Sequence, residues 1–140
     1  MSLSIEQQRA SFALQAIEQA LAMPETGHYQ HKEVKSYVRR LPAMIQSNGF
    51  GQALAFYYAK RENYAAYGVV YQMIEDWLCQ SGQVYATTQG AVSPPRLLRA
   101  IVSSDQVAYR RAQAETMALL LWLKKFAEAL IRSQHPQQGD

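Results

Sequence analysis

The chain has 140 residues, of which 49% are hydrophobic and 18% charged, and a formal net charge of +3. This length corresponds to one domain, and the composition excludes an intrinsically disordered chain. The longest apolar run, 117–123, is too short to span a membrane, and the single cysteine, Cys79, excludes an internal disulfide. We expect a reduced, cytoplasmic protein that begins without a signal peptide.

Two amphipathic helices are predicted in the first third of the chain. Residues 4–23 place their apolar side chains on one half of a helical wheel, with Ser4 as the N-cap and Gln7 completing a capping box. A second helix is predicted over residues 29–46 from the spacing of its apolar side chains. Because proline removes a backbone hydrogen bond within a helix, we expect a kink or a break at Leu41-Pro42.

Four further helices complete the chain. They are predicted over residues 51–60, 63–80, 93–102 and 105–133, with a loop over 81–92. Asn48-Gly49 should end the second helix in a left-handed C-cap, and Asn63 should cap the fourth helix. Pro94 and Pro95 fit the first turn of the fifth helix, and residues 103–105 should cap the last one.

The sequence therefore predicts an all-α protein, a compact bundle of about six helices with a long C-terminal helix. One helical domain would cover residues 1–134, followed by a flexible tail over 135–140. The last helix has a broad apolar arc, and the side opposite this arc carries a mixed strip. The strip consists of Arg111, Glu115, Ala118, Trp122, Lys125, Ala129 and Arg132. Because a large ring lies there between cations, we predict that Trp122 is partly exposed and contacts a partner protein.

Residues that catalyse reactions or bind metals are few and scattered. His28 and His31 share a helix face, but a closed zinc site needs about four ligands, so we interpret both as solvated. Cys79 lies on an apolar helix, which is typical of a small buried hydrophobe. The neighbouring carboxylates Glu75-Asp76 point about 100° apart and form no acid–base dyad. We expect no metal, no cofactor and no enzymatic activity.

Basic residues occur in doublets. The doublets are Arg39-Arg40, Lys60-Arg61, Arg110-Arg111 and Lys124-Lys125. Arg111 and Lys125 are separated by nearly four helical turns, so both lie on one face of the last helix, about 21 Å apart. Such spacing suits the phosphate backbone of a nucleic acid. The alternative is a solvated face with two ion pairs, Arg111–Glu115 and Lys124–Glu128.

Two segments, together with the opening Arg9-Ala10 helix, resemble one protein family. Residues 37–57, YVRRLPAMIQSNGFGQALAFY, closely resemble the LPxMIxxNGLxxALAF stretch of the small α-helical subunit of Cmr-type (type III-B) CRISPR effector complexes. The residues that resemble the family's C-terminal YR…E…WLKRFA helix are Tyr109-Arg110, Glu115 and the run from Trp122 to Ala127. Phe50 stands where leucine is usual and Lys125 where arginine is usual, and both changes preserve the residue character.

The resemblance implies a non-catalytic subunit of an RNA-guided antiviral complex. Members of that family stack as a minor filament beside the backbone subunits that hold the guide RNA, and one end of the filament meets the large subunit. The implied partners are those subunits, copies of the chain itself and the guide–target RNA duplex. The candidate nucleic-acid-binding residues are Arg39, Arg40, Arg110, Arg111, Lys124 and Lys125. The alternative is a stand-alone helical protein that binds a specific nucleic-acid duplex by itself.

Overall fold

The computed structural model describes residues 3–88 and 93–132, and within these residues it contains six helices and no strand. The helices are α1 (Ile5–Ala22), α2 (His31–Asn48), α3 (Phe50–Lys60), α4 (Ala65–Leu78), α5 (Arg96–Ser103) and α6 (Gln106–Leu130). The all-α prediction is confirmed, and α6 is the longest of these helices, with 25 residues. The predicted tail over 135–140 lies outside the described residues, so the domain division at residue 134 stays a prediction.

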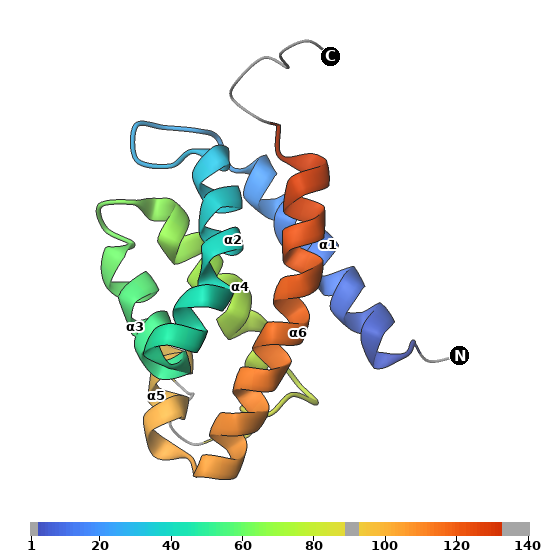
Figure 1. Cartoon of the computed structure of the whole chain (residues 1–140), viewed down its shortest axis with the longest axis vertical. Helices are drawn as coiled ribbons and strands as arrows, with labels where there is room; N and C mark the ends of the chain where they lie inside the picture. Colours follow the sequence, from blue (N-terminus) through green and yellow to red (C-terminus); the bar gives the residue numbers. More distant parts are fainter. Residues whose placement is uncertain (1–2, 89–92, 133–140) are drawn as a thin grey trace.

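The helices pack around one hydrophobic core (Figure 1). Helix α2 packs against α6, α3 and α4, and α5 packs against α3 and α4 near the start of α6. Helix α1 crosses α6, and this is the most extensive contact between any two of the described helices. The first turn of α1 projects beyond the bundle in Figure 1, and Leu3 and Ile5 are exposed there. The crossing of α1 over α6 decides which side of α6 remains accessible.

Two helix starts follow the predicted capping chemistry. The Ser4 hydroxyl accepts a hydrogen bond from the Gln7 N–H at 3.1 Å, and the Gln7 side chain accepts one from the Ser4 N–H at 2.9 Å. This reciprocal pair confirms the capping box at the start of α1. At the start of α6, the Asp105 carboxylate accepts from the Ala108 N–H at 2.9 Å. Local polar side chains therefore define where both helices begin.

The start of α4 differs from the prediction. Asn63 does not cap the helix, which begins at Ala65 and has no side-chain cap. The Ala65 N–H donates instead to the backbone carbonyl of His28 at 3.0 Å, across the connection between α1 and α2. A carbonyl distant in sequence thus satisfies a helix-start donor that the prediction had assigned to the Asn63 side chain.

Helix α2 also ends differently from the prediction. It continues through Pro42 to Asn48, so the predicted break is wrong, while a kink at this position stays a prediction. Gly49 has a positive φ of 93°, as a glycine C-cap should, but its ψ of 152° lies outside the left-handed helical region. The N–H of Gly49 still bonds to the Ile45 carbonyl at 2.9 Å, and α3 begins at the very next residue, Phe50. This glycine-dependent conformation turns the chain directly from one helix into the next.

Candidate nucleic-acid interface

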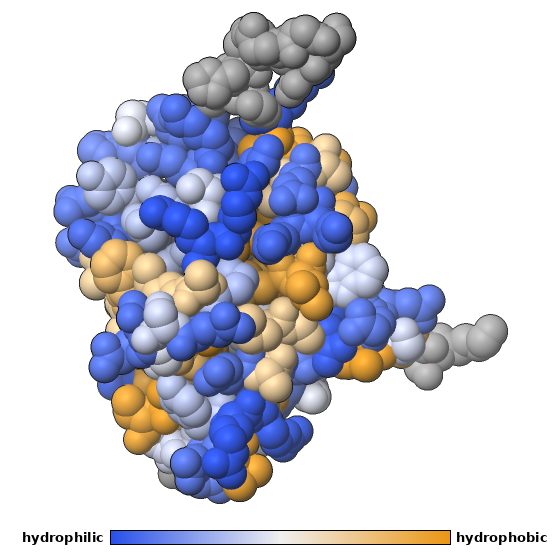
Figure 2. All heavy atoms as spheres, in the orientation of Figure 1, coloured by the Kyte–Doolittle hydropathy of each residue, from blue (hydrophilic) through white to orange (hydrophobic). Residues whose placement is uncertain are grey.

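The exposed side of α6 defines the first candidate surface. Its exposed residues, here called the outer face of α6, are Val107, Arg110, Arg111, Ala114, Leu121, Lys125, Glu128 and Ala129. In Figure 2 the surface over the middle of α6 is hydrophobic, with hydrophilic side chains above and below it. Leu121 contributes strongly to this hydrophobic surface, because 67% of its area is exposed. The outer face therefore combines an apolar centre with cations toward both ends.

The outer face of α6 carries three cations, Arg110, Arg111 and Lys125. Among residues 3–88 and 93–132, no ion pair involves Arg110, Arg111 or Lys125. The α-helical rise places Arg111 and Lys125 about 21 Å apart along the axis. These charges are therefore available to an anionic partner that extends along α6.

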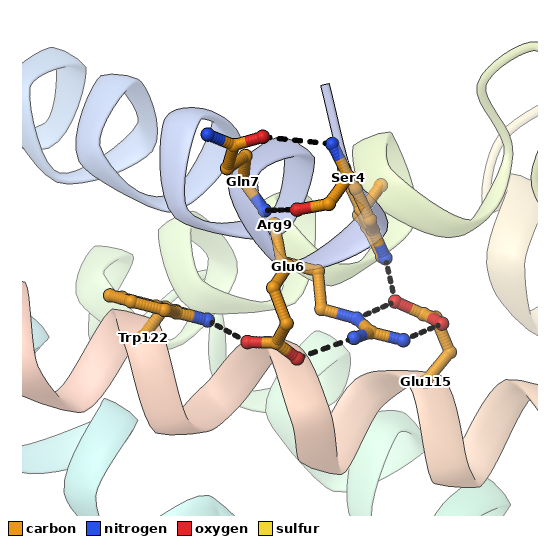
Figure 3. A network of polar contacts seen from close by, with 7 residues as sticks. Ser4, Glu6, Gln7, Arg9, Glu115 and Trp122 are labelled. Carbon is orange, nitrogen blue, oxygen red and sulfur yellow. Dashed lines mark hydrogen bonds and ion pairs between the residues drawn. The ribbon is translucent and has the colours of Figure 1, made fainter. Parts of the chain in front are cut away.

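The rest of the predicted strip lies in a contact with α1, which we call the α1–α6 clamp. Figure 3 shows Arg9 of α1 directed at Glu115 of α6. The guanidinium makes two bonds to the carboxylate, Nε to Oε2 at 2.6 Å and Nη2 to Oε1 at 2.9 Å. The indole N–H of Trp77 in α4 also donates to Glu115, at 2.9 Å. The Arg9 hydrogen bond, and secondly that of Trp77, lower the pKa of Glu115 below its ordinary value.

Trp122 belongs to the same clamp. Its indole N–H donates to the Glu6 carboxylate at 2.8 Å, and Glu6 also binds Arg9 at 2.7 Å (Figure 3). The Trp122 ring stacks on Phe126 with a centroid distance of 5.7 Å and is half-buried. Partial exposure of Trp122 is therefore confirmed, and its contact with a partner protein stays a prediction. The strip that contains Trp122 is not fully open to solvent, because α1 packs against it at Glu115 and Trp122.

The ion-pair alternative for the strip is wrong in the form predicted. Glu115 pairs with Arg9 rather than with Arg111. Between Lys124 and Glu128 no ion pair is found in the part of the chain that the structure describes. The sequence pairs Glu115 with Arg111, four residues earlier on the same helix. In the folded protein Arg9 of α1 binds Glu115 instead.

The six candidate nucleic-acid-binding residues lie on two neighbouring helices. Four of them belong to α6 and two to α2, and Arg39, Arg110, Arg111 and Lys125 are exposed there. Lys124 is half-buried. The exposed Arg40 donates to the Tyr67 hydroxyl at 3.1 Å, and its guanidinium lies 5.0 Å from the centre of the Tyr37 ring. The structure therefore brings five accessible cations to α2 and α6 without joining them into one site.

The histidines and the cysteine were weighed above as metal ligands or as a nucleophile. Within the described ranges, no cluster of three or more histidine, cysteine or acidic residues is found. His31 contacts the Met23 carbonyl at 2.8 Å, and its other ring nitrogen lies 3.6 Å from Glu25. Cys79 is buried, and burial raises the pKa of its thiol to about 11. No described helix has the length and hydropathy needed to cross a bilayer.

Residues that carry the family resemblance form contacts inside the protein. Besides Glu115 and Trp122, the Tyr109 hydroxyl accepts from the Gly51 N–H at 2.9 Å and so joins α6 to the first turn of α3. Phe50, the first residue of α3, packs edge-on against the Tyr109 ring, 5.6 Å away. Sequence reasoning quoted these residues but missed that they face one another. No pattern within either segment indicates this pairing, because it depends on how α6 packs against the start of α3.

A comparison with known families agrees with these motifs. The family model of a CRISPR-associated protein (Cas_Cmr5) matches residues 5–130. The match extends from the first residue of α1 to the last residue of α6, so it covers every described helix and both motif segments. The chain therefore belongs to the Cas_Cmr5 family of CRISPR-associated proteins and is a Cmr-associated subunit.

Proposed function

We propose that the chain is the non-catalytic small subunit of a type III-B (Cmr) CRISPR effector complex. It stacks as a minor filament and contributes a basic surface to the binding of the guide–target RNA duplex. Its partners are the backbone subunit, the large subunit and further copies of itself, with Trp122 at a contact between subunits. The observation that carries this proposal is the outer face of α6, whose three cations are exposed on a member of a CRISPR-associated family.

RNA is the partner that fits this surface because its backbone repeats a negative charge along its length. Arg110 and Arg111 lie in the first third of α6 and Lys125 in the last, so the charges follow the long axis of the helix. Contacts of this kind bind phosphates and carry no information about the base sequence. In a guided complex, base pairing reads the sequence while the protein binds the backbone.

A non-catalytic role agrees with the chemistry of the side chains. The thiol of Cys79 is buried and protonated at neutral pH, since its pKa is raised to about 11. The buried carboxylate of Glu75 accepts hydrogen bonds from the Tyr71 hydroxyl at 2.8 Å and the Leu97 N–H at 2.9 Å. Glu115 is held by Arg9 and Trp77. These contacts give Cys79, Glu75 and Glu115 structural roles.

Charge reversal on the outer face of α6 tests the proposal. A reconstituted effector complex carrying Arg111→Glu and Lys125→Glu should capture target RNA about tenfold more weakly at low salt. The loss should shrink as the salt concentration rises and should be the same for unrelated matched guide–target sequences. Capture is measured by a filter or gel-shift titration with labelled target RNA, and circular dichroism checks the folding of the subunit.

A matched control separates local contacts from net charge. Lys32→Glu with Arg99→Glu changes the net charge equally at two exposed cations outside the candidate set, and should leave capture near the parent level. If the α6 variant assembles normally and captures RNA as well as the parent at every salt concentration, the outer face has no RNA contact. Tight binding of one duplex by the isolated chain would favour the stand-alone alternative instead.

A further inference from the structure

A second group of cations, on α2 and α3, lies beside exposed aromatic rings of α3 and of the residue that precedes α4. This aromatic–cation cluster consists of Arg40, Phe56, Lys60, Tyr64 and Tyr67. The Tyr67 ring is its hub, because the centroid of Phe56 lies 5.7 Å from that of Tyr67 and the centroid of Tyr64 lies 6.3 Å from it. The Tyr67 ring therefore joins aromatic residues that come from separate parts of the chain.

Two rings of the cluster are open to solvent. Phe56 is 39% exposed and Tyr64 is 47% exposed, whereas Tyr67 is buried beneath them. Figure 2 shows a hydrophobic patch over α3, the helix that carries Phe56, beside hydrophilic side chains. Isolated exposed apolar residues are common on proteins, but here two exposed aromatic rings meet the same buried Tyr67 ring edge-on, with interplanar angles of 90° and 76°. Each exposed ring can stack with a flat ring of a ligand.

The cluster is held in place before any partner binds. The Tyr37 and Tyr67 rings stack at 3.7 Å with an interplanar angle of 8°, and Tyr57 meets the Tyr67 ring edge-on at 4.9 Å. The Tyr57 hydroxyl donates in turn to the backbone carbonyl of Tyr37 at 2.7 Å. Because the supporting rings are buried and fixed, a ligand that stacks on the exposed rings loses little entropy by ordering them.

The cations of the cluster lie against its aromatic rings. The Lys60 ammonium lies 5.5 Å from the centre of the Phe56 ring, and the Arg40 guanidinium binds the Tyr67 hydroxyl at 3.1 Å. Neither side chain forms an ion pair within residues 3–88 and 93–132. The neighbouring Arg61 differs, because it covers the Tyr58 ring and lies 4.0 Å from Glu62. Two positive charges therefore remain uncompensated next to two exposed rings.

We propose that the aromatic–cation cluster binds single-stranded RNA, with bases stacked on Phe56 and Tyr64 and phosphates at Arg40 and Lys60. This inference rests on the proposed function as a subunit that meets RNA. A nucleotide carries a flat ring and a negative charge in one unit, and the cluster offers a matching surface for each. An apolar protein partner would cover the rings but leave both cations without a counter-charge, so RNA fits the cluster better. Lys60, from the doublet Lys60-Arg61, would then bind single-stranded RNA, whereas the outer face of α6 binds the guide–target duplex.

Loss of the exposed rings is the direct test. The full chain should bind a short fluorescein-labelled oligouridine at low salt more tightly than an RNA duplex of the same length, as measured by fluorescence anisotropy. Phe56→Ala with Tyr64→Ala should weaken oligouridine binding by about thirtyfold or more, because each of the two stacked bases contributes through an aromatic face. The ring-preserving variant Phe56→Tyr with Tyr64→Phe should bind within about twofold of the parent.

Salt dependence separates stacking from charge. Arg40→Gln with Lys60→Gln should lower the salt dependence of oligouridine binding by about 1.4 in the slope of log K against log salt. The ring-removing variant should lower affinity by a similar factor at every salt concentration, since stacking releases no counterions. Circular dichroism and urea unfolding confirm that each variant folds.

The outcomes distinguish this inference from the proposed function. If the chain does not bind oligouridine, or if ring removal leaves binding unchanged, the cluster is not an RNA site. The proposed function still stands in either case when the Arg111 and Lys125 variant of the complex loses target RNA. If ring removal prevents assembly with other Cmr subunits but leaves oligouridine binding intact, the cluster is a protein contact and the inference is overturned.

Discussion

Two sides of α6 differ sharply although their residues alternate along the same turns. In the α1–α6 clamp, Glu115 and Trp122 are half-buried and hydrogen-bonded to residues of α1. On the outer face, Arg111 and Leu121 are exposed, and Leu121 immediately precedes Trp122 in the chain. One side of the helix therefore stabilises the fold, while the other is free to meet a partner.

This difference shows that a helical wheel identifies a shared face without identifying what covers it. The strip predicted opposite the apolar arc contained both Glu115 and Lys125 because their positions on the wheel are close. The crossing of α1 divides the strip, since Arg9 reaches Glu115 whereas Lys125 stays exposed. A contact between elements 106 residues apart thus determines which polar residues of α6 are structural.

Removal of Glu115 should have the largest effect on the clamp. Glu115→Ala removes the acceptor of the Trp77 N–H and of two Arg9 nitrogens, Nε and Nη2, and leaves the 15% exposed Arg9 side chain with Glu6 as its remaining carboxylate. We expect the free energy of unfolding to fall by about 2 kcal/mol, because partly buried donors lose their hydrogen bonds. Urea unfolding followed by circular dichroism measures this change.

The matched control for this prediction is Glu128→Ala on the outer face of the same helix. Glu128 is exposed and forms no ion pair with any residue in the described ranges. Its removal should change the free energy of unfolding by less than about 0.5 kcal/mol. Equal losses from both substitutions would show that the clamp has no special part in stability.

Acid should weaken the clamp selectively. The hydrogen bonds from Arg9 and Trp77 lower the pKa of Glu115 below 4.5, so the native state holds this carboxylate charged at pH values where the unfolded chain protonates it. The resulting stabilisation is fully present at pH values above 4.5, and it disappears as the pH falls through the native pKa of Glu115. The stability difference between the parent and Glu115→Gln should therefore shrink below pH 4.5, as measured by urea unfolding across the acid range. A difference that stays constant with pH would contradict this assignment.

Local features of the fold were predictable because they depend on residues close in sequence. The capping box at Ser4 and Gln7 involves neighbours three positions apart, and the Asp105 cap of α6 is equally local. Apolar spacing, together with capping, glycine and proline signals, predicted six helices near the observed positions. The exposure of Arg111 and Lys125 also followed from the wheel of a single helix.

Features that depend on tertiary contacts were not predictable in the same way. The Asn63 cap was wrong because a carbonyl of another loop binds the Ala65 N–H. Glu75 was interpreted only as one of two adjacent carboxylates, yet it is buried and binds the Leu97 N–H at the start of α5. In both cases an acceptor distant in sequence binds a backbone N–H at the start of a helix. No local sequence pattern predicts such a hydrogen bond. The clamp between Arg9 and Glu115 was missed for the same reason.

The smallest effect on the isolated chain should come from the apolar centre of the outer face. Leu121 is 67% exposed, so Leu121→Ala removes few contacts and keeps a strong helix former. We expect the free energy of unfolding to change by less than about 0.5 kcal/mol in urea unfolding. The adjacent Leu120, which is 1% exposed, is the matched control, and Leu120→Ala should cost about 2–5 kcal/mol by leaving a cavity. A comparable loss from both leucines would mean that α6 buries its outer face in the isolated protein, and the cations beside Leu121 would then not be free to reach RNA.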